Sequence, residues 1–363
     1  MSEEPTKSYE ERLQELITEL EDLTGQLQDL TLNHRRSFSP QEKAAPVETE
    51  PGESSEQAQG GALRHLQDTL RQSVFNRDVW KGVWYMLKYV AQSDAALVQR
   101  RLRGEFETDP WGFDQEFLDL VRPFLNLMYS SYFRVETTGL DNVPAAGRAL
   151  LVANHSGQLP WDGMMIGMAI LNEHPEQRLV RTLYAAILSR MPYVSSALTR
   201  LGQTLATVEN GTRLLEEEEL VAVFPEGYKG LGKSFRDRYR LARFGRGGFA
   251  QMALNTGAPI IPVSVVGAEE TYITLAKLPT IFEITGIPYV PITLTFPWLG
   301  LLGLVPLPTK WYIDFGAPIL VDGYDPDAAS NPVYVSQISD QVRNAIQEMI
   351  HSRLAQRHSV FFT

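Results

Sequence analysis

From residue 136 onward, short apolar runs alternate with helix-forming segments, and this alternation constrains the fold more than any other feature. Strands are predicted at 149–153, 180–187, 220–224, 260–266 and 312–315, and helices at 161–172, 208–217, 248–255 and 333–353. The pattern is typical of an α/β domain with a mostly parallel central sheet flanked by helices. Ligands of such sheets bind beyond the carboxyl ends of the strands, so reactive residues are expected there.

The composition is that of a globular protein with a sizeable core. Hydrophobic residues make up 44% and charged residues 21% of the 363 residues. The absence of cysteine excludes disulfides, thiolate metal sites and a cysteine nucleophile. The polar, acidic start does not resemble a signal peptide, and no uncharged apolar run could form the helix of roughly 18 residues that spans a membrane.

The net charge of −11 is concentrated at the N-terminus, because residues 1–60 carry 14 of the 44 acidic but only 5 of the 33 basic residues. The rest is nearly neutral, which does not indicate a nucleic-acid-binding domain. Leucines at steps of three and four within 1–32 predict either a short coiled coil for self-association or a partner, or a lone amphipathic helix. The polar composition of 33–62 predicts a disordered linker.

Residues 63–135 are predicted to be helical and amphipathic, and they are rich in aromatic side chains. Such helices can lie in a membrane interface, with their rings at the level of the lipid headgroups. The alternative is ordinary packing against the following domain, which we place at 136–358. Packing is the more frequent role for most aromatic residues, so we expect it for the majority of them.

One turn carries the strongest chemical signal. The apolar run at 149–153 ends in Asn154-His155, a turn with Gly and Pro follows, and a helix is predicted from Trp161. His155 is therefore expected at a strand's carboxyl end and Asp162 in the first turn of a helix, where the dipole favours a carboxylate. A carboxylate on one imidazole nitrogen leaves the other to remove a proton from an alcohol. From these residues alone, simple capping of the turn and the helix is an equally good interpretation.

His155 with a spaced Asp162, followed later by Phe-Pro-Glu-Gly at 224–227, resembles the glycerolipid and lysophospholipid acyltransferase family over about residues 120–320. Four residues typically separate the His and the Asp in that family, whereas six separate them here. The longer spacing resembles the 1-acylglycerol-3-phosphate acyltransferase-like branch close to monoacylglycerol and diacylglycerol acyltransferases. The resemblance implies that His155 is the general base and Asp162 its partner in acyl transfer.

The resemblance also implies which residues hold the substrates. Glu226 and Gly227 are expected to hold the polar acceptor, and the strand with Pro262 is expected to contact the donor or shape the pocket. The predicted substrate-binding residues are Gly157, Glu226, Gly227, Lys229, Lys233 and Pro262. The structural alternatives are a plain strand-ending turn at 225–227 and a core strand with a proline at its edge at 260–266.

A basic segment follows, since residues 229–246 carry seven Lys or Arg against one Asp. This local positive field suits a phosphate headgroup, the phosphates of CoA or an anionic lipid. We predict substrate contact for Lys229 and Lys233 and solvation for the other charges. The family often has a Gly-Arg pair that binds an acceptor phosphate, but here Gln203 follows Gly202. This departure favours a neutral acceptor or shifts the phosphate-binding role to the basic segment.

Two alternative functions remain open. Residues 227–234 fit the phosphate-binding loop of nucleotide hydrolases, which would make the chain a P-loop hydrolase. That loop should open a helix, whereas 235–245 is rich in arginine and shows no clear apolar face. The other alternative is a membrane-associated scaffold that keeps the fold without activity.

Residues 287–308 contain five prolines and no charge. The prolines exclude a long helix, so we expect a loop that dips into one leaflet or lines an acyl tunnel. The sequence as a whole predicts an O-acyltransferase, bound peripherally to the inner face of the cell membrane. It would use acyl-CoA or acyl-carrier protein as donor and a glycerolipid as acceptor, without a metal, cofactor or nucleic-acid partner.

Overall fold

The computed structural model describes residues 104, 107–155, 161–190, 192–227, 233, 235–245, 247–279, 289–293, 303, 305–325, 327–357 and 359–361. All of them belong to the second of the two units into which the chain divides, Ala62–Thr363. The predicted helix at 1–32, the predicted linker at 33–62 and most of the predicted helices at 63–135 lie outside the described residues. Gly157 and Lys229 lie outside them as well.

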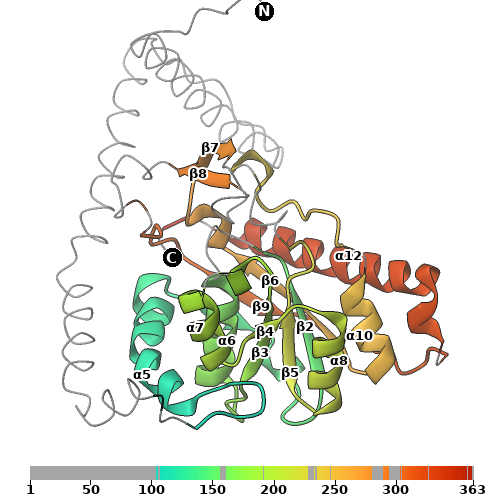
Figure 1. Cartoon of the computed structure of the whole chain (residues 1–363). Coiled ribbons are helices and arrows are strands. Elements are labelled where there is room, and N and C mark those ends of the chain that lie inside the picture. The colour runs from blue at the N-terminus through green and yellow to red at the C-terminus, as the bar shows by residue number, and fades with distance from the viewer. Residues whose placement is uncertain are drawn as a thin grey trace, which may run out of the picture. The chain divides into compact units, whose positions relative to one another are not determined.

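Seven strands form the central sheet, in the order β1-β9-β6-β2-β5-β3-β4 (Figure 1). The strands are β1 Glu136–Thr138, β2 Ala149–Ala153, β3 Val180–Tyr184, β4 Thr204–Leu205, β5 Leu220–Val223, β6 Ile260–Val266 and β9 Tyr312–Phe315. Every pairing is parallel except that of β6 with β9. The prediction of a mostly parallel α/β sheet is confirmed, and the short strands β1 and β4 at its two edges are additions to it.

Helices cover both faces of the sheet. The α-helices are α5 Gln115–Asn126, α6 Trp161–Glu173, α7 Pro192–Arg200, α8 Val208–Glu216, α10 Gly248–Thr256 and α12 Pro332–Gln356. Single turns lie at η1 Leu127–Tyr132, η2 Leu140–Asn142, η3 Leu188–Arg190, η4 Phe235–Asp237, η5 Ala268–Glu270 and η7 Ala328–Ser330. The strand predicted at 180–187 was too long, because the chain leaves the sheet after Tyr184 and turns into η3. Helix α7 was not predicted.

The pleat of β2 divides the core into two halves. Ala149, Leu151 and Ala153 pack with α6 and the η1 turn, whereas Leu150 and Val152 pack with α8, α10 and α12. This alternation is the two-residue period of a strand, and both faces are apolar because both are covered. All five residues of β2 are fully buried. The strand is thus held rigidly from both sides, and the chain that leaves its carboxyl end starts from a fixed position.

Pro262 stands inside the central strand β6, not at the edge of the sheet. It pairs with Val152 of β2, and its carbonyl accepts a hydrogen bond from the backbone N–H of Gly316 at 2.8 Å. The β9 ladder begins only at Val263, and Ile260 is bonded instead to Ile319. Because residues 316–318 leave the ladder at this point, the missing N–H of Pro262 breaks no strand pairing.

The helix predicted at the end of the 63–135 region is present as α5, but it continues as a π-helical turn. Asp114 caps α5 by accepting a hydrogen bond from Phe117 N at 2.9 Å, and the π-helical turn η1 follows. Tyr129, Tyr132 and Phe133 are buried, so packing and not membrane contact is the outcome for these three aromatic residues. The membrane interpretation of residues 63–103 lies outside the described part of the chain.

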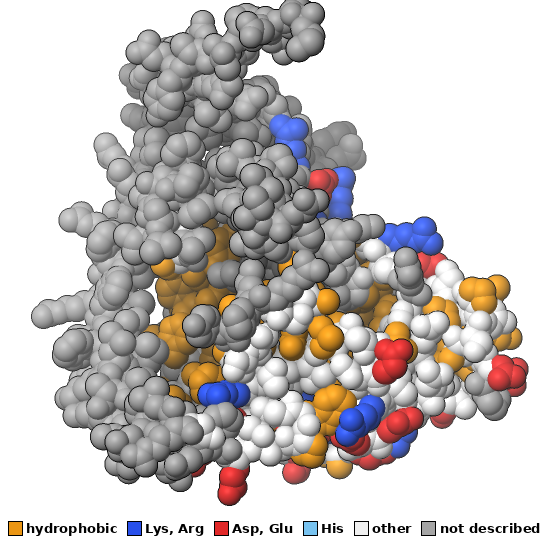
Figure 2. Space-filling view, in the orientation of Figure 1, with side chains coloured by type: hydrophobic (Ala, Val, Ile, Leu, Met, Phe, Trp, Pro, Cys, Tyr) orange, Lys and Arg blue, Asp and Glu red, His pale blue; other side chains and the backbone are white. Residues whose placement is uncertain are grey.

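Part of the predicted loop at 287–308 is a strand, because β8 Tyr289–Thr293 pairs with β7 Thr274–Pro279 in a separate two-stranded antiparallel sheet. On the face shown in Figure 2, hydrophobic side chains alternate with polar ones and with charges of both signs. The exposed large hydrophobic residues belong to separate segments and are Val194, Val305, Leu320, Tyr324 and Val333. Among the described residues, no helix has the length and apolarity needed to cross a membrane.

Candidate active site

The chain leaves β2 through Asn154, whose side chain replaces the next backbone pairing. Its Oδ1 accepts a hydrogen bond from Val265 N at 2.7 Å, and its Nδ2 donates to Val265 O at 3.0 Å. Asn154 is fully buried and extends the contact between β2 and β6 by one residue. The backbone is therefore free to turn away at His155. Since β5 and β6 lie on opposite sides of β2, this turn lies at a point where the strand order reverses, which is where α/β sheets bind ligands.

His155 and Asp162 form a hydrogen-bonded pair, as the sequence predicts. Nδ1 of His155 lies 2.6 Å from Oδ2 of Asp162, and Oδ1 accepts from Gly163 N at 2.8 Å. The Asp162 side chain is completely buried, whereas 13% of the His155 side chain remains exposed. Nε2 of His155 makes no hydrogen bond to any of the described residues. The aspartate thus fixes the ring through one nitrogen and leaves the other available to a substrate.

The imidazole is also held against the end of β5. Its ring lies 4.7 Å from the ring of Phe224, at an angle of 32°. A side chain at Gly163 would come within 3.2 Å of Thr182 and 3.5 Å of Phe224, so glycine allows the first turn of α6 to pack closely. The orientation of His155 is therefore fixed by a carboxylate on one side and an aromatic ring on the other.

Glu226 holds the backbone on both sides of the site. Oε1 accepts a hydrogen bond from His155 N at 3.1 Å, and Oε2 accepts from Ala242 N at 2.7 Å. Nζ of Lys233 lies 2.8 Å from the same Oε2. The Glu226 side chain is fully buried, and its carboxylate connects the distant turn at His155 to two points of the segment that follows Glu226, Lys233 and Ala242. Acceptor binding by Glu226 stays a prediction, and in this geometry its oxygens already bind protein groups.

Lys233 bridges Glu226 to a second carboxylate. Its Nζ lies 3.2 Å from Oε1 of Glu269, and Oε2 of Glu269 accepts a hydrogen bond from Tyr239 N at 2.9 Å. Only 9% of the Lys233 side chain is exposed. Substrate binding by Lys233 therefore also stays a prediction, because the ammonium is used within the protein.

Burial dominates the electrostatics behind the turn. It raises the pKa of Glu269 to about 7, although the Lys233 ammonium and the Tyr239 N–H act in the opposite direction. Burial also raises the pKa of Glu270, against the effect of Arg357, whose Nη1 lies 2.6 Å from the carboxylate. We call Glu226, Lys233 and Glu269 the buried charge cluster. A buried charge is tolerated only when it is paired and hydrogen-bonded, so this cluster fixes the segment around Tyr239 to the end of the sheet.

The remaining predicted residues lie in different surroundings. Gly227 follows Glu226 with a φ of +55°, and an added Cβ would meet no atom of the described residues within 4 Å. Its positive φ is therefore what calls for glycine at this turn. Pro262 is buried within the sheet, three positions before Val265, which is level with Asn154.

The P-loop alternative is not supported by the described part of the motif. The segment after it begins with a three-residue 3-10 helix, η4, and not with an α-helix. Lys233, which would bind phosphate in such a loop, is paired with Glu226 and Glu269. The prediction that 235–245 lacks an apolar face was wrong, because Tyr239 and two further residues of the segment, Leu241 and Phe244, are buried.

Sequence reasoning did not identify Glu269, Tyr239 or Ala242. A usable signal existed for Glu269, since two glutamates follow Gly267 directly after a buried strand, at the functional edge of the sheet. The contact through Ala242 is made by a backbone N–H, which no residue type reveals. Among the described residues, no group of three or more acidic or histidine side chains is arranged to hold a metal ion.

Comparison with known proteins agrees with this site. A family model described as Acyltransferase matches residues 134–266, which include the His155–Asp162 pair and Glu226. An uncharacterized protein of Mycobacterium leprae is 44% identical over 316 residues, or 86% of each chain. An uncharacterized protein of Mycobacterium tuberculosis is 47% identical over 269 residues, covering 74% of this chain and 75% of the relative.

Two more distant proteins are named for lipid chemistry. A Bos taurus protein called DGAT1/2-independent enzyme synthesizing storage lipids is 25% identical over 221 residues, or 60% of each chain. The chain also matches the crystal structure of the 1-acyl-sn-glycerophosphate (LPA) acyltransferase PlsC from Thermotoga maritima. The match covers 79% of this chain and 99% of the other, with 16% sequence identity and a TM-score of 0.45. On the strength of the family match and the mycobacterial relatives, the chain belongs to the acyltransferase family.

Proposed function

We propose that this acyltransferase moves a fatty acyl group from a thioester donor to a hydroxyl of a lysophospholipid or glycerolipid acceptor. The observation that carries the proposal is the His155–Asp162 pair, with 2.6 Å between Nδ1 and Oδ2 and with Nε2 free of any described partner. A base of this kind suits a reaction that begins with the deprotonation of an alcohol.

In this mechanism, Nε2 of His155 takes the proton of the acceptor hydroxyl while the hydroxyl oxygen attacks the carbonyl carbon of the thioester. Asp162 stabilises the imidazolium that forms. The tetrahedral intermediate then collapses, the carbon–sulfur bond breaks, and the imidazolium returns its proton to the leaving sulfur. A thiol pKa of about 8.5 makes the thiolate a much better leaving group than an alkoxide, so no covalent enzyme intermediate is required.

The glycerolipid acceptor is the more specific part of the proposal. It is supported by the resemblance of the two motifs and by the relative that is named for storage-lipid synthesis. The absence of an arginine after Gly202 favours a neutral acceptor such as a monoacylglycerol or diacylglycerol. A phosphorylated acceptor such as lysophosphatidic acid is the competing case, and a direct assay distinguishes the two.

The decisive assay measures thiol release from palmitoyl-CoA by the purified full chain. Lysophosphatidic acid, other lysophospholipids, monoacylglycerol and diacylglycerol are offered separately. We expect acceptor-dependent release that falls roughly a thousandfold or more in His155→Ala, which removes the base. Release at the wild-type rate from a folded His155→Ala protein would disprove the mechanism. Inactivity of the wild type with both CoA and carrier-protein donors would favour the non-catalytic scaffold.

We further propose that the protein acts at the inner face of the cell membrane, bound peripherally. The support is the uncharged composition of 287–308 and the lipid nature of the proposed acceptor. Sedimentation with vesicles of phosphatidylcholine and phosphatidylglycerol tests this directly. Protein that stays in the supernatant at every lipid composition would contradict it.

A further inference from the structure

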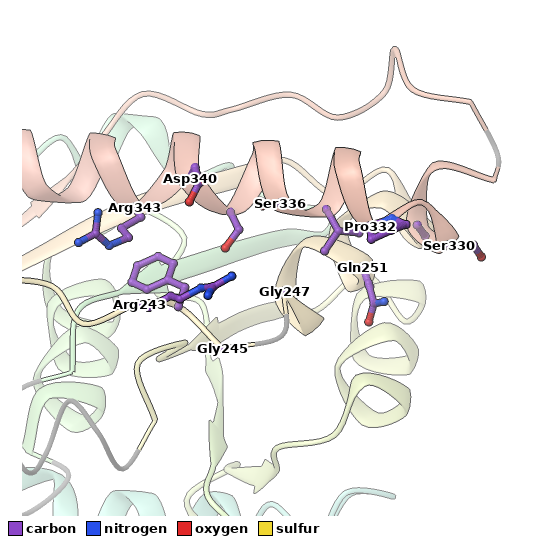
Figure 3. A pocket seen from close by; sticks show the side chains of 13 residues that line it. Arg243, Gly245, Gly247, Gln251, Ser330, Pro332, Ser336, Asp340 and Arg343 are labelled. Atoms are coloured by element: carbon purple, nitrogen blue, oxygen red, sulfur yellow. The ribbon is translucent and has the colours of Figure 1, made fainter.

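A cavity of about 560 Å³ lies beside the active-site turn, between the segment 243–247 and the first half of α12. This volume is within the usual range of small-molecule sites, roughly 300–1,000 Å³. Figure 3 shows Ser336 and Asp340 on α12 facing the segment that carries Arg243. His155 and Asp162 are not among the lining residues, so the cavity is separate from the candidate active site.

Two glycines give the cavity its shape. Gly247 has a φ of +75°, and a Cβ there would lie 2.3 Å from Cγ1 of Val335, so glycine lets this segment touch α12. Gly245 is exposed, and the nearest atom to an added Cβ would be Pro225 O at 3.6 Å. The walls therefore meet at Gly247, while the space at Gly245 stays open to a ligand.

The lining is polar and carries a net positive charge. Arg243 and Arg343 reach it from opposite walls, Asp340 is the single carboxylate among the described lining residues, and Ser336 and Ser339 supply hydroxyls. Arg343 is held in place because it donates to Leu241 O at 2.9 Å. Arg243 is exposed and forms no hydrogen bond or ion pair with any described residue. Two guanidinium groups with neighbouring hydroxyls are suited to an anion that accepts several hydrogen bonds, above all a phosphate.

One wall of the cavity is hydrogen-bonded directly to the turn at 225–227, which contains Glu226. Gly245 N donates to Pro225 O at 3.1 Å, and Ala242 N donates to Glu226 Oε2 at 2.7 Å. Glu226 in turn holds His155 through the backbone. A ligand that uses both places needs a phosphate-bearing end for the cavity and an extended arm that reaches the base. A CoA thioester has this form, since its nucleotide phosphates and its reactive sulfur lie at opposite ends.

We propose that the cavity binds the phosphate-bearing nucleotide of a CoA thioester donor. The proposal rests on the acyl-transfer function and extends it, because it selects CoA over a carrier protein. It also gives Arg243, which none of the motif residues contacts, a role in donor binding. The same chemistry could serve the phosphate of a lysophosphatidic acid acceptor, so the test must separate the two sources.

The test is calorimetric binding of free CoA, pantetheine and lysophosphatidic acid to the full chain. The site variants are Arg243→Ala, which removes a free cation, and Ser336→Trp, which fills the cavity from an exposed helix position. The matched control is Arg240→Ala, an exposed arginine of the same segment outside the lining. Neither the Arg243 nor the Ser336 side chain forms a hydrogen bond with a described residue, so both variants are expected to fold, and thermal melting of each variant verifies this.

We expect Arg243→Ala to weaken CoA binding roughly tenfold, the usual effect of a lost charge-assisted hydrogen bond. Ser336→Trp should weaken it at least as much because the indole occupies the cavity, and the control should change it less than about twofold. Pantetheine, which lacks the phosphates, should be insensitive to Arg243→Ala. Unchanged CoA affinity in both site variants, or wild-type protein that does not bind CoA, would overturn the proposal. So would a loss of affinity for lysophosphatidic acid instead of CoA. CoA binding that depends on Arg243 in a protein without thiol release would leave this site standing and refute only the acyl-transfer function.

Discussion

Asp162 and Glu226 are both buried carboxylates at the same edge of the sheet, yet they are used differently. Asp162 binds one ring nitrogen of His155, and that ring keeps a second nitrogen for another partner. Glu226 binds two backbone N–H groups and the Lys233 ammonium, so its oxygens are occupied by the protein. A group that is to react needs a free atom, whereas a group that supports the site needs none. The motif residues thus divide into the His155–Asp162 pair, in which one ring nitrogen has no described partner, and a supporting cluster.

The largest effect is expected from Asp162→Asn. The amide keeps the shape but presents an N–H to the ring, which favours the wrong tautomer of His155 and no longer stabilises the imidazolium. By analogy with such changes in other His–Asp pairs, thiol release should fall about 10²- to 10⁴-fold.

The control for Asp162→Asn is Asp141→Asn, because Asp141 is exposed on the short η2 turn. The control should keep the wild-type rate. A rate in Asp162→Asn within a small factor of wild type would place Asp162 among the supporting residues and remove the contrast.

Glu226→Gln should affect stability and activity together. The neutral amide cannot satisfy the N–H groups of His155 and Ala242 and the ammonium of Lys233 at once. We expect the free energy of unfolding in denaturant to fall by about 1–3 kcal/mol, with a loss of kcat because His155 is less well positioned. If stability is unchanged and only the KM for the acceptor rises, then Glu226 binds the acceptor, as the resemblance to the family implies.

Glu269→Gln should reveal the titration of the buried charge cluster. Because burial raises the pKa of Glu269 to about 7, the folded state holds this proton more tightly than the unfolded chain does. The contribution of this group to stability is therefore present at low pH and is lost as the pH rises through the window up to about 7. We expect the loss to be on the order of 3 kcal/mol at most.

Chemical denaturation of wild type and Glu269→Gln across this pH window checks the prediction. The variant cannot titrate, so its free energy of unfolding should depend less steeply on pH than that of the wild type. Glu348→Gln, at an exposed position of α12, is the control and should follow the wild type. Parallel curves for Glu269→Gln and wild type would show that Lys233 keeps Glu269 ionised throughout.

The smallest effect is expected for Gly227→Ala, compared with Gly257→Ala. Both glycines have a positive φ, +55° and +66°, and an added Cβ meets no atom within 4 Å at either position. Each variant should therefore lose about 1–2 kcal/mol of stability from backbone strain alone. Gly227 lies at the active-site turn and Gly257 at the end of α10, so only Gly227→Ala should also lower acyl transfer. Equal activity of the two variants would show that no substrate approaches Gly227 closely.

Much of the fold could be predicted from the sequence, because local composition indicates short apolar runs for strands β2, β6 and β9 and helix-forming segments for α6, α8 and α10. What local patterns left open depends on the surroundings of a segment. Tyr129 and Tyr132 belong to an amphipathic stretch that suits a membrane or a core equally well, and only the packing of the domain buries them. Pro262 occurs inside a central strand because a neighbouring strand ends at its level.

The sequence by itself determined the α/β class and the His155–Asp162 pair, because these two residues are only seven positions apart and one turn brings them together. Only the tertiary structure decided the rest of the site. Glu226 reaches a backbone N–H 71 residues away, and Lys233 reaches a carboxylate 36 residues away. Contacts of that kind depend on strand order and on how loops close over the sheet, and both are set by the burial of the whole core and not by any local pattern.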